Sequence, residues 1–105
     1  MKSISARELS EMLKRGDDFL LLDVRNQDEY DFAKIEGAKL LPMPELEERL
    51  EELDKSRKTV VFCHAGGRSS KAVKLMEEEG FRDVINLAGG ITSWSDTVDP
   101  SVPKY

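Results

Sequence analysis

The sequence predicts an α/β domain in which helices flank a central, mostly parallel sheet of about five strands. Apolar runs of strand length alternate with amphipathic segments of helical length, a pattern typical of parallel sheets. Two of these runs, 19–24 and 59–62, are nearly continuous in apolar residues, which indicates strands buried on both faces. The chain has 105 residues without repeats or low-complexity segments, so we expect one domain over 1–105.

The predicted strands share short length, apolar side chains and flanking polar, glycine or proline residues. In chain order they are the segments 3–4, 19–24, 39–41, 59–62 and 83–87. The third is closed by Pro42, because proline has no N–H to continue a ladder.

Each predicted helix is bounded by a start or stop signal. The starts are the capping-box patterns Ser5-x-x-Glu8 and Asn26-x-x-Glu29, Pro44 at a first helical position, and the end of the loop before Ser69. The stop signals are Gly16 and, after a helix over about 69–79, Gly80. The second predicted helix is short and runs through Tyr30 and Phe32. The expected inward residues are Leu9, Met12 and Leu13, then Leu46, Leu50 and Leu53, then Ala72, Val73 and Met76. A short helix around Trp94 precedes a proline-containing tail over 97–105.

Composition excludes several classes of protein. Sixteen basic and 21 acidic residues give a formal charge of −5, which argues against a nucleic-acid partner. No apolar run approaches the roughly 18 residues of a membrane span, and no signal-peptide pattern opens the sequence. Cys63 is the only cysteine and cannot form an intrachain disulfide. We therefore expect a cytoplasmic protein with neither a membrane nor a nucleic-acid partner.

Polar residues follow two of the predicted strands, at 23–25 and 63–68. Parallel sheets bind ligands beyond the carboxyl ends of their strands, so both segments are candidate site residues. After Cys63, the pair Gly66 and Gly67 allows backbone conformations in which successive N–H groups converge on one point. The following helix start and its arginine add positive charge, which favours thiolate over thiol. The pattern predicts an activated sulfur nucleophile that can hold an anion.

The segment 63–70, Cys-His-Ala-Gly-Gly-Arg-Ser-Ser, resembles the active-site loop of the rhodanese family. Two flanking segments resemble other signatures of that family, in its order and spacing. They are Asp23-Val24-Arg25 with Glu29-Tyr30, Ile35-x-Gly37-Ala38 and Pro42, and Leu87-Ala88-Gly89-Gly90-Ile91 with Trp94. The chain departs from the family around Ile35, where Ala33, Lys34 and Glu36 replace the usual Gly-His and Pro. That stretch is structural in the family, so we expect the departure to affect local packing.

The resemblance implies a rhodanese-like three-layer fold and a sulfurtransferase that works through a Cys63 persulfide. The implied donor is an anion such as thiosulfate, or a protein persulfide, and the acceptor is a thiol, cyanide or a sulfur-carrier protein. No metal and no cofactor are implied. The site residues implied are Cys63 as the catalytic residue, His64, Ala65, Gly66, Gly67, Arg68 and Ser69 as substrate-binding residues, and Asp23 and Arg25 in support.

Several site residues have a second interpretation. Arg68 either attracts an anionic donor or is a solvated residue at a helix start. His64 is expected to line the loop mouth, with general-base catalysis as the alternative, because adjacent residues in a tight loop usually point apart. Asp23 and Arg25 are expected to pair structurally, with substrate contact as the alternative. Trp94 is expected in the core or at its rim.

Two other functions remain open. The tail 99–105 resembles the ends of rhodanese domains attached to adenylating enzymes that load ubiquitin-like sulfur carriers. This favours a partner-gated relay module as the main alternative. A phosphatase of the related cysteine-loop type requires an arginine at the seventh loop position. Here Arg68 is the sixth residue and Ser69 the seventh, so the spacing argues against a phosphatase.

Overall fold

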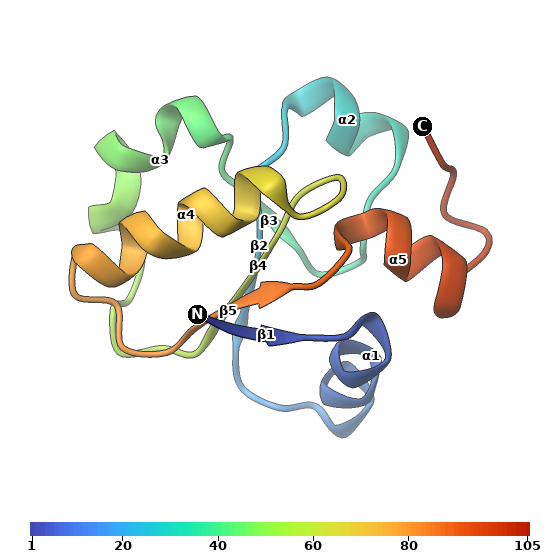
Figure 1. The fold of residues 1–105 in the computed structure, drawn as a ribbon, viewed down its shortest axis with the longest axis horizontal. Coiled ribbons are helices and arrows are strands. Elements are labelled where there is room, and N and C mark those ends of the chain that lie inside the picture. Colours follow the sequence, from blue (N-terminus) through green and yellow to red (C-terminus); the bar gives the residue numbers. More distant parts are fainter.

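Five parallel strands form the central sheet of the computed structural model, which describes residues 1–105 (Figure 1). The strands are β1 (Lys2–Ile4), β2 (Leu20–Asp23), β3 (Lys39–Leu40), β4 (Thr59–Phe62) and β5 (Val84–Leu87). Their order across the sheet is β1-β5-β4-β2-β3, with every neighbouring pair parallel. The predicted α/β fold with a five-stranded parallel sheet is confirmed.

The helices flank the sheet on both faces (Figure 1). They are α1 (Ala6–Arg15), α2 (Gln27–Phe32), α3 (Met43–Arg49), α4 (Gly67–Glu78) and α5 (Gly90–Thr97), with a 3₁₀ turn, η1, over Leu50–Glu52. The capping box of α1 is present, since the Ser5 N–H donates to Glu8 Oε1 (3.0 Å) and the Glu8 N–H to Ser5 Oγ (3.1 Å). No helix combines the length and apolarity needed to span a bilayer.

Four strands and the third helix differ from their predicted bounds by one residue at one or both ends, and three other differences are larger or concern the helices that flank the site. The predicted third helix is divided at Leu50 by η1, although Leu53 beyond it is still buried. The fourth helix starts at Gly67, two residues before the predicted start, because Gly66 forms its N-cap in a left-handed conformation. The last helix extends through Thr97, so the irregular part of the tail begins one residue later. Leu13, predicted on the inward face of the first helix, is exposed.

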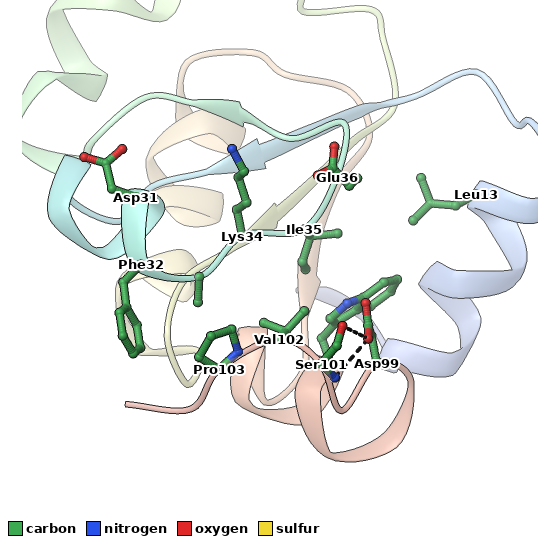
Figure 2. A pocket seen from close by; sticks show the side chains of 12 residues that line it. Leu13, Asp31, Phe32, Lys34, Ile35, Glu36, Asp99, Ser101, Val102 and Pro103 are labelled. Carbon is green, nitrogen blue, oxygen red and sulfur yellow. Dashed lines mark hydrogen bonds between the residues drawn. The ribbon is translucent and has the colours of Figure 1, made fainter.

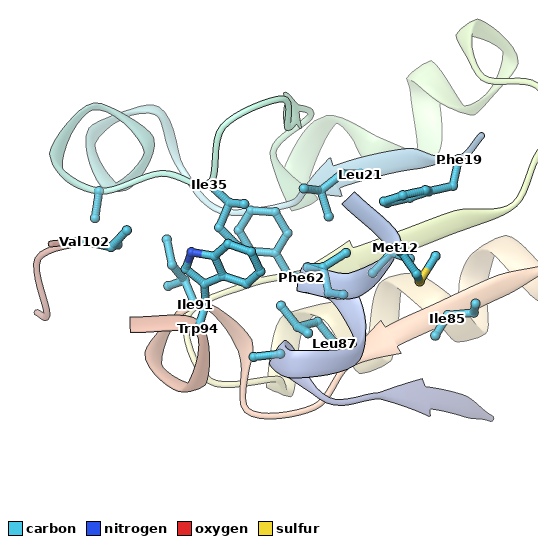
Figure 3. Close-up of a cluster of buried hydrophobic side chains, with 14 residues drawn as sticks. Met12, Phe19, Leu21, Ile35, Phe62, Ile85, Leu87, Ile91, Trp94 and Val102 are labelled. Atoms are coloured by element: carbon cyan, nitrogen blue, oxygen red, sulfur yellow. The ribbon is translucent and has the colours of Figure 1, made fainter. Parts of the chain in front are cut away.

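Two apolar clusters lie on opposite faces of the sheet. Figure 3 shows the first, which includes Trp94 and packs beneath α1 and α5. The second packs beneath α3 and α4. Along β4, Val60 and Phe62 belong to the first cluster, whereas Val61 and the next residue after the strand, Cys63, belong to the second. Because successive strand side chains alternate between faces, this register directs the cysteine towards α4.

The sheet register also brings the two polar segments together. Asp23 at the end of β2 lies opposite Phe62 at the end of β4. The Val24 N–H donates to the Phe62 carbonyl (3.1 Å), which extends the pairing by one residue. Cys63 therefore leaves the sheet beside Val24, at the carboxyl edge of two adjacent parallel strands.

Candidate active site

Cys63 lies buried at the bottom of a loop that joins β4 to α4. Two backbone N–H groups are directed at its Sγ atom, from Gly66 at 3.1 Å and from Ser69 at 3.4 Å. The Ser69 hydroxyl lies 3.4 Å from the same sulfur. Gly66 has a φ of 119°, a left-handed conformation that a side chain would strain. This turn reverses the backbone tightly enough for amides three and six residues later to face the sulfur.

These contacts favour the charged form of the cysteine. Burial alone raises the pKa of the Cys63 thiol, because it disfavours the charged form. Hydrogen bonds from the Ser69 hydroxyl and from backbone N–H groups outweigh burial, so the pKa lies below its ordinary value. The lowered pKa increases the fraction of thiolate near neutral pH, and thiolate is the nucleophilic form.

The Ser69 hydroxyl is shared between the sulfur and a buried amide. It lies 2.5 Å from Asn86 Oδ1 on β5 and 3.2 Å from the Gly66 carbonyl. The hydroxyl donates its single proton to Asn86 Oδ1, an amide oxygen that can only accept, and its lone pairs can accept from the Cys63 thiol. It can stabilise the thiolate only by turning that proton from Asn86 to the sulfur, so Asn86 and the thiolate compete for the Ser69 proton.

The pH dependence of alkylation tests this arrangement. We expect iodoacetamide to modify Cys63 with an apparent pKa below the ordinary thiol value of about 8.5. In Ser69→Ala, which loses a bond that stabilises the thiolate, we expect that pKa to rise by about one unit. Mass spectrometry of alkylated protein against pH measures both. An unchanged profile in the variant would show that the backbone amides alone set the thiolate fraction.

The start of α5 fixes the path of the loop. The Ile91 N–H donates to the Cys63 carbonyl (3.0 Å), and the Thr92 N–H and hydroxyl both donate to the His64 carbonyl (3.1 Å each). This close approach requires Gly90, where an added Cβ would lie 2.4 Å from the His64 carbonyl oxygen and 2.5 Å from that of Cys63. The loop is thus held by a helix that is remote from it in sequence.

Arg68 lies at the loop mouth in an ion pair with Glu29. Its Nη1 donates to Oε1 at 2.6 Å and its Nη2 to Oε2 at 2.9 Å. The Arg68 side chain is 36% exposed and that of Glu29 is 14% exposed. The hydrogen bonds from Arg68 lower the pKa of Glu29 to about 2, against the opposing effect of burial. The arginine at this loop mouth is therefore neutralised by a carboxylate across the whole physiological pH range.

Asp23 and Arg25 form a fully buried pair beside the loop. Arg25 Nε lies 2.9 Å from Asp23 Oδ1, and Nη2 lies 2.7 Å from Oδ2. The remaining Arg25 donors bond the carbonyls of Ala33 (2.7 Å) and Glu29 (3.3 Å), and its guanidinium lies over the Phe62 ring. These contacts fasten α2 and the chain after it to the carboxyl edge of the sheet.

His64 is covered by the last residue of the sequence. Its ring stacks on that of Tyr105 with centroids 4.0 Å apart and an interplanar angle of 11°. The Tyr105 hydroxyl donates to Glu29 Oε2 (2.7 Å) and accepts from Arg25 Nη1 (3.0 Å). The tail therefore forms one wall of the loop mouth and connects the Arg68 ion pair to the buried Arg25.

Sequence reasoning did not assign three residues now seen at this site. Glu29 was recognised only as a helix cap and as part of a family signature, and Tyr105 only as part of a tail. Asn86 carried a usable signal, since it is a polar residue within an apolar strand and therefore needs a buried hydrogen-bond partner. The ion pair between Glu29 and Arg68 spans 39 residues of sequence, so no local pattern could indicate it.

A pocket of about 360 Å³ lies elsewhere, between the chain after α2 and the tail (Figure 2). Its apolar lining includes Phe32, Ile35, Trp94, Val102 and Pro103. Asp99 turns the tail beside it by accepting hydrogen bonds from the Ser101 N–H and hydroxyl. No residue of 63–69 lines this pocket. No cluster of three or more His, Cys, Asp or Glu side chains is arranged to hold a metal ion.

The sheet and the loop together define an α/β domain with a thiolate-stabilising cysteine loop at the carboxyl edge of a parallel sheet. The family follows from comparison with known proteins. The model of the rhodanese-like domain matches residues 5–97, and the chain belongs to this sulfurtransferase family. The predicted family is confirmed.

Three known proteins illustrate the similarity. The chain is 35% identical over 105 residues to a probable adenylyltransferase/sulfurtransferase, MoeZ, of Mycobacterium tuberculosis, covering 98% of this chain and 27% of MoeZ. It is 37% identical over 93 residues to thiosulfate sulfurtransferase GlpE of Coxiella burnetii, covering 89% of this chain and 86% of GlpE. The crystal structure of a rhodanese-related protein of Thermoplasma volcanium superposes with a TM-score of 0.85 at 33% identity, covering 93% of this chain and 94% of that one. The chain thus spans about a quarter of MoeZ but most of GlpE.

Proposed function

We propose that the protein transfers sulfane sulfur through a persulfide on Cys63, with thiosulfate as a donor. The observation that carries this proposal is the pair of backbone N–H groups, from Gly66 and Ser69, directed at Sγ. A terminal persulfide sulfur bears a negative charge, which fixed amides near a helix start stabilise as they stabilise the thiolate. The similarity to GlpE, a named thiosulfate sulfurtransferase, supports the same chemistry.

The first step loads the cysteine. The Cys63 thiolate attacks the outer sulfur of thiosulfate, a new S–S bond forms, and the sulfur–sulfur bond of thiosulfate breaks. Sulfite leaves with the electron pair of that bond, and Cys63 becomes an anionic persulfide. The amides of the loop and the amino end of α4 stabilise the negative charge throughout, so the step needs no proton transfer to or from the protein.

The second step unloads the cysteine. A thiolate or cyanide attacks the terminal persulfide sulfur, and the Cys63 thiolate leaves with the electrons of the broken S–S bond. The low pKa of Cys63 makes it a good leaving group as well as a nucleophile. This two-step exchange is covalent catalysis with ping-pong kinetics.

Intact-protein mass spectrometry after incubation with thiosulfate tests the proposal. We expect the protein to gain one sulfur atom, which cyanide or a thiol removes, and the Cys63→Ser variant to gain none. Protein that gains no sulfur while Cys63 remains open to alkylation would exclude thiosulfate as the donor. Sulfur gained by the Ser variant would place the chemistry elsewhere than at Cys63.

A second candidate is a relay module that exchanges sulfur chiefly with a protein partner. Two observations favour it: Tyr105 covers His64 at the loop mouth, and the chain matches about a quarter of MoeZ, named as both adenylyltransferase and sulfurtransferase. A relay module would load slowly from thiosulfate and quickly from a protein persulfide. Equal loading rates from both donors would count against it.

A further inference from the structure

Arg68, the cation expected to attract an anionic donor, is already paired with Glu29. Both outer nitrogens of Arg68 bond to Glu29, in a two-point contact of 2.6 and 2.9 Å. Such a planar, bidentate pair has both strong charge assistance and defined geometry. Any anion that approaches the loop therefore meets a carboxylate beside the guanidinium rather than an isolated positive charge.

Glu29 is held in this position by two further donors. The backbone N–H of Asn26 donates to Oε1 at 3.1 Å, and the Tyr105 hydroxyl donates to Oε2 at 2.7 Å. The same hydroxyl accepts from Arg25, whose guanidinium is fixed by the buried Asp23. Each Glu29 oxygen therefore has one bond to Arg68 and one to a separate anchor, which resists rotation of the carboxylate away from the arginine.

This placement affects donors according to their charge. Arg68 directly precedes Ser69, whose N–H lies 3.4 Å from Cys63 Sγ, so an anion at the sulfur also lies within the field of Arg68 and of the carboxylate paired with it. The electrostatic energy of an anion near the pair is proportional to its charge, so cancelling one positive charge costs a dianion about twice as much binding free energy as a monoanion. The pair therefore disfavours donors with the larger negative charge.

We propose that Glu29 is a specificity-determining residue, which masks Arg68 and thereby favours sulfur donors with one negative charge over doubly charged thiosulfate. The inference rests on the proposed function and narrows its donor class. Glu29 acts through Arg68 and is a positioning residue rather than a catalytic one. Tyr105 assists it by fixing the carboxylate.

A thiosulfonate is the matched donor for this comparison. Attack by Cys63 on the outer sulfur of methanethiosulfonate breaks its sulfur–sulfur bond and releases methanesulfinate with the electron pair. The products are the same Cys63 persulfide and one small anion. The bond broken corresponds to that of thiosulfate, whereas the donor carries one negative charge instead of two.

The test is the ratio of kcat/KM for thiosulfate to kcat/KM for methanethiosulfonate, with cyanide as the common acceptor. We expect Glu29→Gln to raise this ratio about tenfold, because it removes one charge near the donor while keeping the shape of the side chain. Tyr105→Phe keeps the ring that stacks on His64 but loses the hydroxyl, and should raise the ratio by about threefold. Because both rates come from the same sample, a change in the folded fraction cancels.

Asp17→Asn is the matched control. Asp17 also pairs with an arginine, Arg15, and its substitution changes the net charge equally, but it precedes β2 at the opposite edge of the sheet. We expect its ratio to stay within twofold of the wild type. A Glu29→Gln ratio that stays within twofold as well would overturn the proposal.

Protection from alkylation separates this inference from the proposed function, because it needs no sulfur transfer. Sulfate and methanesulfonate differ by one charge, and each is titrated for its ability to slow modification of Cys63 by iodoacetamide. We expect Glu29→Gln to improve protection by sulfate about tenfold relative to methanesulfonate. Improved protection without sulfur gain from any donor would show that Glu29 selects anions at Cys63 by charge, but would reject the proposed function and with it the choice among sulfur donors. Unchanged relative protection in a protein that does gain sulfur would reject the inference alone.

Discussion

Gly90→Ala is expected to reduce the free energy of unfolding by about 3 kcal/mol or more. Gly90 has a φ of 58°, so any side chain adds left-handed strain. Its added Cβ would also lie within 2.4–2.7 Å of the backbone of Cys63 and His64, where no flexible side chain can move aside. Urea denaturation followed by circular dichroism measures the loss.

The same substitution should also slow the loading of sulfur onto Cys63. Relief of the clash requires α5 to move from the loop, which lengthens the bonds from the Ile91 and Thr92 amides to the loop carbonyls. The amides that face Sγ would then be less well placed, so we expect slower sulfur loading even at temperatures where the variant is folded.

Gly80→Ala is the matched control for strain without collision. Gly80 has a φ of 90°, and an added Cβ would meet nothing within 4 Å. Its cost should be about 1–2 kcal/mol, which is that of the left-handed conformation. If Gly90→Ala and Gly80→Ala were equally destabilised, the collision with the loop backbone would add nothing to the cost of the left-handed conformation.

Arg25→Met is expected to cost about 3–5 kcal/mol, a large part of the stability of a domain of this size. The substitution preserves much of the side-chain length but leaves the Asp23 carboxyl group buried and without its guanidinium partner. It also removes the donors to the carbonyls of Ala33 and Glu29. Chemical denaturation at neutral pH measures the loss, and Arg25→Lys, which keeps the charge, should fall between it and the wild type.

The pair of Arg15 and Asp17 provides the control for burial. It has the same two residue types two positions apart, with a similar Nη2–Oδ2 distance of 2.8 Å, but it is exposed. Arg15→Met should therefore lower the free energy of unfolding far less than Arg25→Met does. A comparable loss of unfolding free energy in Arg25→Met and Arg15→Met would show that burial does not increase the cost of removing the arginine.

The sequence predicted the secondary structure well where the signal was local. β2 and β4 have continuous apolar runs, and such runs are stable only when both faces are covered. The capping box of α1 was predicted because its two hydrogen bonds join residues three positions apart. Local signals failed at Leu50, where the helix gives way to a 3₁₀ turn, and at Leu13, which helical spacing alone placed inward.

The candidate site also has a part that local sequence signals predict and a part that they do not. The loop from Cys63 to Ser69 could be predicted because its glycines, helix start and cysteine are contiguous in sequence. The environment of that loop could not, since Glu29, Asn86 and Tyr105 reach it from other elements. Arg68 shows the consequence most clearly: its charge is evident from the sequence, whereas its neutralisation by Glu29 is not.

The sequence alone thus determined the α/β fold class, the family resemblance and the cysteine, because these depend on the order and spacing of residues along the chain. Only the tertiary structure decided what surrounds the sulfur and how much charge a donor meets there. The physical reason is the separation along the chain of the residues that interact. Caps and strand patterns act over a few residues, whereas ion pairs and buried hydrogen bonds depend on distance in space, which only the packing of the sheet and its helices establishes.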